Sequence, residues 1–316
     1  MREVIDPGCL SFRPLYMERV WGGKKLATLF GRQLPTTNAI GESWELVDRS
    51  EAQSVVSAGK FRGATLHELW TKHRSEIFGD GYDYARFPLL IKILDASDVL
   101  SVQVHPPVHR AIELPEEPKT EMWYFVATDE DVAVYVGLKE GATKANFQSA
   151  VEKGALEDLL HRIPTRPDSF MFLPGGRLHA IDAGNVLFEV QQNSDTTYRV
   201  FDWNRIGFDG KPRTLHVEQS LQCIDFADFE PSLGEILDER LVSQDCFTVD
   251  QWVLNQPRPA NAEPKFSIFQ VICGTVSFDT SHEFRFGDLF MVPGLGGHRS
   301  LVASKNGTAV VLRTTL

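Results

Sequence analysis

Four side chains with metal-binding chemistry stand at the ends of short apolar runs in the middle of the chain. Gln103 and His105 close one such run, and residues two apart in a strand point to the same face. Glu121 opens the next apolar run, and His179 follows a Pro-Gly-Gly turn that returns the chain to the same end. Two imidazoles, a carboxylate and an amide oxygen form a ligand set suited to Zn²⁺, Mn²⁺, Fe²⁺ or Co²⁺.

The combination of these residues carries more weight than any one of them. A histidine considered alone is more often a structural residue held by hydrogen bonds, and a Gln-x-His pair is a weak motif. Glu121, however, precedes a run of aromatic residues, where an unpaired buried carboxylate would be unfavourable. Together the four side chains predict a single metal ion bound by all of them.

Further polar side chains lie within the predicted strands. Glu189 and Gln191 alternate with apolar residues in the run 186–192, so both point to one face, which we expect to meet a ligand. The alternative is a polar edge that faces water. Arg199 lies in the middle of another strand, where an arginine must reach water or pair. An ion pair with Glu189 or Asp202 is the structural alternative for this arginine.

Two lysines, a serine and two tryptophans complete the candidate site. Lys92 interrupts an apolar run and fits only a cavity, whereas Lys119 shares a strand face with the carboxylate two residues later. Either lysine would act as an acid or base if burial lowers its pKa, or would bind substrate oxygens or phosphate. Ser101 shares the face of the Gln-x-His pair and would donate to a phosphate. Trp21 and Trp44 are expected to line the ligand, with a place in the core as the alternative.

The elements that must position these groups are short β runs separated by Gly, Pro, Asn and Asp. Their spacing predicts an antiparallel sandwich or barrel. The predicted strands cover 88–94, 100–105, 121–127, 132–138, 169–174, 186–192, 197–203, 266–274, 275–279, 289–293 and 309–314. Three segments have helical spacing instead: 64–79, 143–163 with Thr143 as N-cap and a bend or break at Gly154, and 214–224 with Thr214 as N-cap.

Composition limits the classes of function. The chain has 316 residues with 32 Lys+Arg against 43 Asp+Glu, a formal net charge of −11 that argues against a nucleic-acid partner. No apolar run reaches the ~18 residues of a membrane span, and the first residues lack a signal-peptide pattern, so we expect a cytoplasmic protein without a membrane partner. The four cysteines form no Cys-x-x-Cys pair and are expected to be free thiols.

Longer stretches around these residues resemble the class I mannose-6-phosphate isomerases of the short bacterial type, which belong to the cupin superfamily. Gln103 stands where the first histidine of the cupin His-x-His motif usually lies. The similarity extends along nearly the whole chain and is strongest from 88 to 205. The matching segments are VWGG (20–23), GESWEL (41–46), IKILDASDVLSVQVHP (91–106), KTEMWY (119–124), PGGRLHAI (174–181) and FEVQQNSDTTYRVFDWNR (188–205).

This resemblance implies a zinc enzyme that interconverts mannose 6-phosphate and fructose 6-phosphate through an enediol(ate), with one Zn²⁺ on the four residues named first. The matching arginine of the family lies in the active site, so Arg199 is expected to stabilise the enediolate. The catalytic base is expected to be Lys119 or Glu189. Arg177 departs from the family, which usually has threonine there, and would add a second cation near the metal or point to solvent.

The resemblance also implies the architecture. We expect a mainly β fold of two cupin-like jelly-roll or β-barrel units with a few helices: a catalytic domain with helical insertions over 1–226 and a smaller domain over 227–316. The second carries only His282 and His298, far apart, and is expected to bind no metal. The competing functions are a non-catalytic cupin that binds or senses a phosphosugar, and an isomerase or oxygenase for another substrate. No oligomeric state follows from the sequence.

Overall fold

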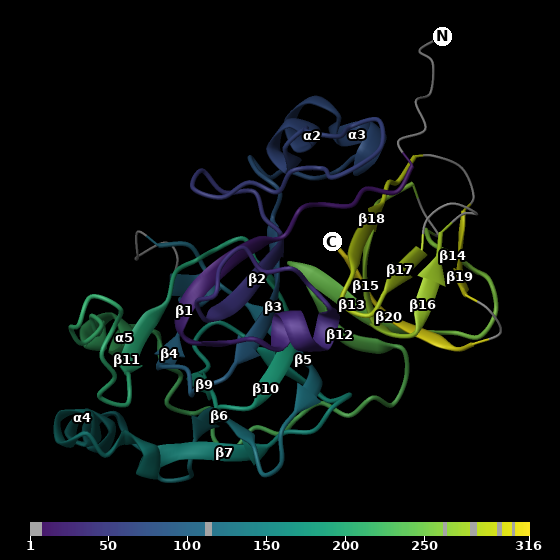
Figure 1. Ribbon diagram of the computed structural model, residues 1–316. Coiled ribbons are helices and arrows are strands. Elements are labelled where there is room, and N and C mark those ends of the chain that lie inside the picture. The colour runs from purple at the N-terminus through teal and green to yellow at the C-terminus, as the bar shows by residue number, and fades with distance from the viewer. Residues whose placement is uncertain (1–7, 111–115, 262–263, 279–282, 296–298, 305–306) are drawn as a thin grey trace. The chain divides into compact units, whose positions relative to one another are not determined.

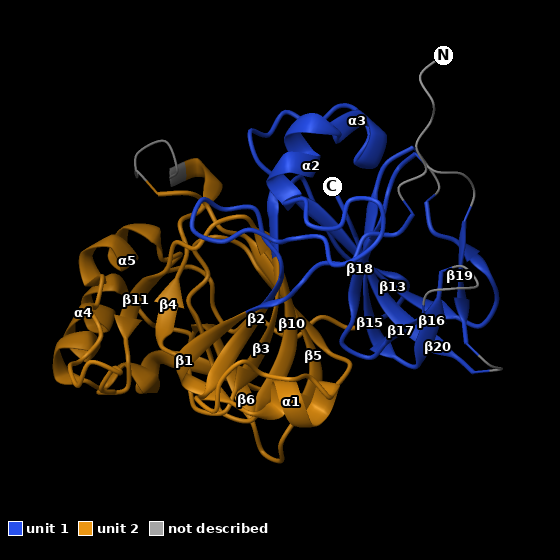
Figure 2. Ribbon diagram, turned by 45° about the horizontal axis from the view of Figure 1, so that its top comes forward, with its two compact units in different colours: residues 1–15, 44–90, 236–316 blue, residues 16–43, 91–235 orange. Residues whose placement is uncertain are grey.

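The computed structural model describes residues 8–110, 116–261, 264–278, 283–295, 299–304 and 307–316. Strands dominate and short helices accompany them, which confirms the predicted mainly β fold (Figure 1). The chain forms two compact units, each discontinuous in sequence (Figure 2). The central unit comprises 16–43 and 91–235, and the terminal unit comprises 44–90, 236–316 and the described part of 1–15.

The residues of these two compact units differ from the two domains expected from the sequence, which were continuous segments of the chain. Residues 44–90 group with the C-terminal part of the chain, although they precede most of the central unit in sequence. A compact unit defined by contacts is not the same as a domain that folds alone. The division into domains over 1–226 and 227–316 therefore stays a prediction.

Two sheets make up most of the central unit (Figure 1). The six-stranded sheet has the order β1 (Leu15–Gly23), β2 (Ile40–Leu46), β3 (Leu89–Ala96), β10 (Asn185–Gln192), β5 (Glu121–Thr128), β8 (Phe170–Leu173). The five-stranded sheet has the order β11 (Tyr198–Phe201), β4 (Val102–Val104), β9 (His179–Ile181), β6 (Ala133–Leu138), β7 (Leu160–Pro164). Neighbours far apart in sequence, such as β3 and β10 or β11 and β4, bring the candidate residues together.

The helix predicted over 143–163 ends early. α4 (Lys144–Lys153) begins after Thr143, whose side chain accepts a hydrogen bond from the backbone N–H three residues ahead in a capping box. Gly154 ends the helix at φ 67°, a left-handed conformation that glycine adopts at little cost. A 3₁₀ turn, η2 (Leu156–Leu159), and then β7 follow, so the helical prediction is wrong beyond that turn.

The helix predicted over 214–224 is also shorter than expected. α5 (Val217–Cys223) is confirmed, but its N-cap is His216, so the prediction of Thr214 as cap is wrong. The backbone carbonyl of Thr214 instead accepts a hydrogen bond from Arg199 at 3.1 Å. The segment just before α5 thus contributes to the surroundings of a candidate site residue. The central unit also contains α1 (Lys25–Phe30) and the 3₁₀ turn η1 (Val108–Arg110).

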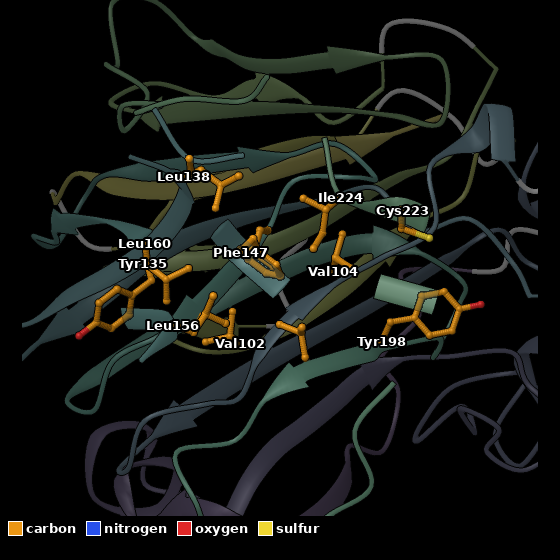
Figure 3. Packing of buried hydrophobic residues seen from close by; sticks show 14 residues of the cluster. Val102, Val104, Tyr135, Leu138, Phe147, Leu156, Leu160, Tyr198, Cys223 and Ile224 are labelled. Atoms are coloured by element: carbon orange, nitrogen blue, oxygen red, sulfur yellow. The ribbon is translucent and has the colours of Figure 1, made fainter. Parts of the chain in front are cut away.

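One face of β4, in this five-stranded sheet, packs against apolar side chains of the helices α4 and α5. Val102 and Val104 of β4 belong to a buried cluster with Phe147 of α4 and Cys223 of α5, and Phe147 lies at its centre (Figure 3). Successive residues of a strand point to opposite faces, so Gln103, between the two valines, points away from these helices. Complete burial of Phe147 stabilises the fold by about 1.5–3 kcal/mol. Packing on one face therefore fixes which side chains face the other.

The terminal unit repeats the two-sheet pattern with shorter strands. Its five-stranded sheet has the order β12 (Arg240–Gln244), β13 (Phe247–Leu254), β20 (Ala309–Thr315), β15 (Ser267–Cys273), β18 (Leu289–Val292). Its four-stranded sheet has the order β14 (Arg258–Pro259), β19 (Ser300–Ala303), β16 (Thr275–Ser277), β17 (Glu283–Arg285). Aromatic and branched residues, among them Phe269, Phe290 and Val311, fill the core of this unit.

The helix predicted over 64–79 is present as two short helices of the terminal unit. α2 (Leu66–Lys72) starts with a capping box on Thr65, and α3 (Arg74–Ile77) follows directly. The expected residues His282 and His298 lie outside the described residues. Within the described chain, the four cysteines are free, as predicted. None of the described helices has the length and apolar character needed to cross a membrane.

Candidate active site and metal centre

A cavity of about 390 Å³ opens in the central unit, and every residue that lines it belongs to 16–43 or 91–235. Charged side chains of both signs line it together with polar and a few apolar ones, so the cavity suits a ligand rich in hydroxyl and anionic groups. The lining residues are Arg19, Trp21, Glu42, Lys92, Leu94, Leu100, Ser101, Gln103, Lys119, Trp123, Ile181, Glu189, Asp195, Thr197, Arg199, Arg213 and His216.

Strand register places three of the candidate residues in one row. In the five-stranded sheet, Gln103 of β4 lies opposite Arg199 of β11 on one side and opposite His179 of β9 on the other. The neighbours of Arg199 in β11, Tyr198 and Val200, belong to the apolar cluster on the opposite face. The same alternation that buries these neighbours directs Gln103 and Arg199 into the cavity.

The predicted metal ligands converge at the end of this row. Glu121, at the start of β5, lies between the two histidines: its Oε2 is 3.5 Å from Nε2 of His105, and its Oε1 is 3.4 Å from Nε2 of His179. One ligand atom from each of these three buried residues lies within 4.8 Å of the others. The side-chain nitrogen of Gln103 is 3.3 Å from Nε2 of His179, so the fourth predicted ligand borders the same point.

Backbone hydrogen bonds set the tautomer of both histidines. Nδ1 of His105 lies 2.8 Å from the carbonyl oxygen of Thr196, and Nδ1 of His179 lies 2.9 Å from that of Arg177. A carbonyl oxygen only accepts, so Nδ1 carries the proton and donates, and Nε2 presents its lone pair to Glu121. Outer hydrogen bonds of this kind orient histidines that bind metals.

Burial and charge fix the protonation of the cluster. Burial, followed by the charge of Lys119, lowers the pKa of His105 to about 4, and burial also lowers the pKa of His179. Burial alone would raise the pKa of Glu121, yet Lys119 and the two histidines hold it well below its usual range. At neutral pH the cluster is two neutral imidazoles and a carboxylate, which are the states that metal coordination requires.

The donor set fits a divalent cation. Both oxygens of Glu121 are buried and accept no hydrogen bond from the described residues. The ammonium of Lys119 lies against the same cluster, with Nζ 2.8 Å from Oε2 of Glu121 and 3.1 Å from Nε2 of His105. A buried carboxylate with unused acceptor capacity, between two imidazole lone pairs, is the arrangement expected of a metal centre.

The opposite wall of the cavity holds a second buried ion pair. Nζ of Lys92, on β3, lies 3.2 Å from Oε1 of Glu189, on the neighbouring β10, and Trp123 donates to Oε2 of Glu189 at 3.0 Å. Burial alone would lower the pKa of Lys92, but Glu189 and other carboxylates raise it above the usual range. The condition for Lys92 to act as an acid or base, a pKa lowered by burial, is therefore not met, and the alternative that it binds substrate oxygens or phosphate stays a prediction.

Arg199 faces the cavity without either of the ion pairs considered for it. Its Nε donates to Oγ of Ser101 at 3.1 Å, and its backbone N–H donates to Nδ1 of His216 at 3.3 Å. Asp202 pairs with Arg213 instead. Burial and the nearby charge of Arg213, which also lines the cavity, lower the pKa of Arg199.

Three residues singled out in the sequence lie away from the cavity. Trp44 is buried but is not among the described residues that line it, whereas Trp21 is. Gln191 donates to the backbone oxygens of its own strand end and turn, at 2.8 and 2.6 Å. Arg177 makes a two-pronged ion pair with Asp228, both contacts at 2.8 Å, and its carbonyl oxygen accepts a hydrogen bond from Nδ1 of His179.

Sequence reasoning missed several residues of the cavity wall. Arg19 and Glu42 form a two-pronged ion pair across β1 and β2, at 3.1 and 3.0 Å. Arg213 and His216 come from the segment before α5, and Asp195 comes from the loop between β10 and β11. Glu42 and Asp195 stood within segments that already matched the family, but no local pattern distinguishes Arg19, Arg213 and His216 from surface residues.

The chain is similar to known proteins over most of its length. The family description "Phosphomannose isomerase type I, catalytic domain" matches residues 10–132. Mannose-6-phosphate isomerase ManA of Bacillus subtilis is 37% identical over 303 residues, which cover 91% of this chain and 94% of that protein. The chain belongs to the type I mannose-6-phosphate isomerase family.

Solved structures of this family have the same fold. The crystal structure of the Bacillus subtilis mannose 6-phosphate isomerase superimposes with a TM-score of 0.87 at 30% identity, over 98% of this chain and 100% of that chain. A mannose 6-phosphate isomerase solved with zinc and yttrium matches with a TM-score of 0.74 at 15% identity, over 97% and 99% of the two chains. The family fold thus extends over essentially the whole protein.

Proposed function

We propose that this protein is a metal-dependent aldose–ketose isomerase that interconverts mannose 6-phosphate and fructose 6-phosphate. One observation carries the proposal: the buried cluster His105, Glu121 and His179 borders a charged cavity in which Gln103 and Arg199 stand in one row. The names of the relatives supply the substrate, and the geometry supplies a site in which that reaction can take place.

The proposed cofactor is one Zn²⁺ ion held by Gln103, His105, Glu121 and His179. The two imidazoles and the carboxylate suit zinc, and a solved family member that shares the fold was crystallised with it. When bound, the ion would supply positive charge that polarises the oxygens of the sugar. With one carboxylate ligand the centre would keep a net charge of about +1, which favours an anionic substrate.

Cationic side chains of the cavity are proposed to bind and orient the substrate anion. The chain as a whole carries −11, so a sugar phosphate needs a local positive surface. Lys92, Arg199 and Arg213 line the cavity and supply it. Trp21 lines the same space and offers an apolar face to the sugar carbons. Ser101, next to Arg199, offers a hydroxyl donor.

The isomerisation requires a base that moves one proton between C1 and C2, and a donor that stabilises the negative oxygen that develops. Arg199 is proposed for the second role, because it lines the cavity and is the strand partner of Gln103, a proposed metal ligand. Lys119 and Glu189 are the two candidates for the base. Oε1 of Glu189 accepts no hydrogen bond from the described residues, and Lys119 lies against the metal cluster.

Exchange of the substrate proton distinguishes these two candidates. In D₂O, the wild-type protein should transfer deuterium from solvent into the sugar during turnover. The variant that removes the base should lose both turnover and exchange while it keeps its metal. The isosteric change Glu189→Gln and the change Lys119→Met each test one candidate. Retained exchange in a variant excludes the residue that was changed.

Experiments can distinguish the proposed function from two competing ones. A non-catalytic cupin that binds or senses a phosphosugar would bind mannose 6-phosphate without turnover. An isomerase for another sugar would turn over a different member of a hexose and hexose phosphate panel faster. The proposal predicts turnover of mannose 6-phosphate by the metal-loaded protein, no turnover after chelation, and a clear preference over the unphosphorylated sugar. We also propose a cytoplasmic location, which the four free thiols support.

A further inference from the structure

The hydrogen bonds around Gln103 point to a role for Ser101 that the proposed chemistry does not use. Ser101 is almost fully buried and lines the cavity one residue before β4. Its Oγ accepts a hydrogen bond from Nε of Arg199 at 3.1 Å and lies 3.4 Å from Oε1 of Gln103. The serine hydroxyl thus lies between the cavity arginine and the amide of a metal ligand.

The side-chain amide of Gln103 can adopt two orientations, which exchange the positions of its oxygen and its nitrogen. In the structure the oxygen faces Ser101, and the nitrogen lies 3.3 Å from Nε2 of His179. The contact to Ser101 is longer than an ordinary O–H···O bond, so it holds this orientation weakly. A metal would bind the lone pair on Nε2 of His179. The Gln103 amide can bind the same metal only through its oxygen. Metal binding therefore favours the amide turned over, with its N–H₂ toward Ser101.

We propose that Ser101 is a positioning residue that couples metal binding at Gln103 to ligand binding beside Arg199. With the amide turned, Oγ of Ser101 accepts from Nε of Arg199 and from the amide N–H of Gln103, which uses both of its lone pairs. The hydroxyl proton, which otherwise points to the amide oxygen, is then directed into the cavity. There it donates to an acceptor oxygen of the bound sugar phosphate, whose identity rests on the proposed function.

Glutamine suits this role because one side chain carries both an acceptor and a donor. The oxygen can bind the metal while the nitrogen of the same amide donates a hydrogen bond to Oγ of Ser101. The strand register holds the partners in place, since Gln103 is paired with Arg199 and with His179 in the same sheet. The coupling must be reciprocal: metal strengthens sugar-phosphate binding by the factor by which sugar phosphate strengthens metal binding.

The test measures binding and not turnover. Calorimetry gives the dissociation constant of sorbitol 6-phosphate, a polyol phosphate with no carbonyl to react, for the full chain with and without saturating Zn²⁺. The ratio of the two constants is the coupling. In Ser101→Ala we expect this ratio to fall about tenfold, the loss expected for one hydrogen bond to an anionic oxygen. Ser101→Thr keeps the hydroxyl and its hydrogen bond, so its ratio should stay within about threefold of the wild-type ratio.

A matched control separates this effect from the loss of any serine. Ser277, on β16 of the terminal unit, has a hydroxyl that bonds to Ser304 at 2.8 Å, and Ser277→Ala should leave the ratio unchanged. The proposal is overturned if Ser101→Ala keeps the wild-type ratio, or if Ser101→Thr falls as far as Ser101→Ala at an unchanged melting temperature. A protein that shows the coupling but does not turn over mannose 6-phosphate would refute the proposed function alone.

Discussion

Nζ of Lys92 and Oε1 of Glu189 lie 3.2 Å apart on neighbouring strands, and both side chains are almost completely buried. Glu189 and other carboxylates raise the pKa of Lys92 despite its burial. The lysine therefore stays charged at the pH of the cell and supplies positive charge to the cavity. A lysine that keeps its proton is suited to orient Glu189 and to attract an anionic ligand, and it is not suited to remove a proton from substrate.

The change Lys92→Met should destabilise the protein because it leaves the Glu189 carboxylate buried without its nearest cation. Breaking one partner of a buried ion pair typically lowers the free energy of unfolding by about 3–5 kcal/mol. The double variant Lys92→Met/Glu189→Gln removes both charges and should recover most of the lost free energy of unfolding. Its turnover should still be lower than that of the wild type. Urea unfolding of the wild type, the single variants Lys92→Met and Glu189→Gln, and the double variant measures this coupling. Additive losses would show that the pair is not coupled.

The change His179→Ala should remove metal and activity together. The imidazole contributes one of the ligand atoms beside Glu121, and no other described side chain stands ready to replace it. Elemental analysis of the purified variant should give well below one ion per chain. His161→Ala is the control, since His161 lies half-buried on β7 and does not line the cavity. Full metal content in His179→Ala would contradict the assigned centre.

The changes Arg199→Lys and Arg199→Ala should keep the metal and lose turnover. Arg199 contacts Ser101 and the cavity but not the histidine and glutamate ligands. Loss of a donor aimed at developing charge usually lowers kcat by about 10²–10³-fold. Lysine keeps the charge but not the planar fork, so Arg199→Lys should recover only part of the loss. Equal kcat in Arg199→Ala and wild type would exclude the role given to this residue.

Strand periodicity is the strong local signal from which the candidate metal ligands and Arg199 were predicted. Gln103 sits between two valines and Arg199 between a tyrosine and a valine, so alternation alone indicated which side chains face away from the apolar core. The register that places Gln103 opposite both Arg199 and His179 depends on long-range pairing of β11, β4 and β9. No local pattern encodes that pairing, which is why their order could not be predicted.

Contacts between segments far apart in the sequence determine the properties of the remaining site residues, which is why the sequence alone did not identify them. The sequence left open whether burial lowers the pKa of Lys92, and the charge of Glu189, from a strand almost a hundred residues away, raises that pKa instead. Arg213 and His216 belong to a segment whose helix starts later than predicted, and only the fold brings them to the cavity. Their local sequence resembles an ordinary exposed turn before a helix.

Stability of the metal-free protein should fall as the pH drops from about 6.5 to about 4. The pKa of His105 is lowered to about 4 in the folded chain, whereas it is about 6.5 in an unfolded chain. The folded state therefore holds His105 neutral, and its contribution is complete above pH 6.5 and is lost as the pH falls through that window. The expected loss is roughly 3 kcal/mol from this residue.

Urea unfolding in the presence of a chelator, at several pH values from 7 to 4, measures this dependence. His105→Asn should flatten the curve in that range, whereas His161→Asn, a change on the half-buried part of β7, should leave its slope unchanged. An equally steep curve in His105→Asn would show that other groups cause the acid sensitivity.

The change Gly175→Ala should weaken both the fold and the metal centre. A Cβ at Gly175 would come within 2.6 Å of the carbonyl oxygen of Pro106 and of the Cα of Pro107. Those residues directly follow His105, and the next residue of the turn donates its backbone N–H to the carbonyl of His105 at 2.9 Å. Pushing the two backbones apart should displace this ligand and lower the metal affinity by at least about tenfold, in line with the loss for disturbed ligand orientation.

Gly307→Ala is the matched control for that prediction. A Cβ at Gly307 meets nothing closer than 3.6 Å, so alanine fits there without movement of its neighbours. Its melting temperature and metal affinity should equal those of the wild type. Wild-type metal affinity in Gly175→Ala would mean that the turn and the ligand segment move independently.

Metal reconstitution followed by an isomerase assay tests the central claim most directly. The purified protein is stripped with a chelator, titrated with Zn²⁺, and assayed for formation of fructose 6-phosphate from mannose 6-phosphate at each step. The account predicts no turnover in the stripped protein and a linear rise in activity that ends at one ion per chain. Absence of turnover at one bound ion, or equal turnover before and after stripping, would contradict it.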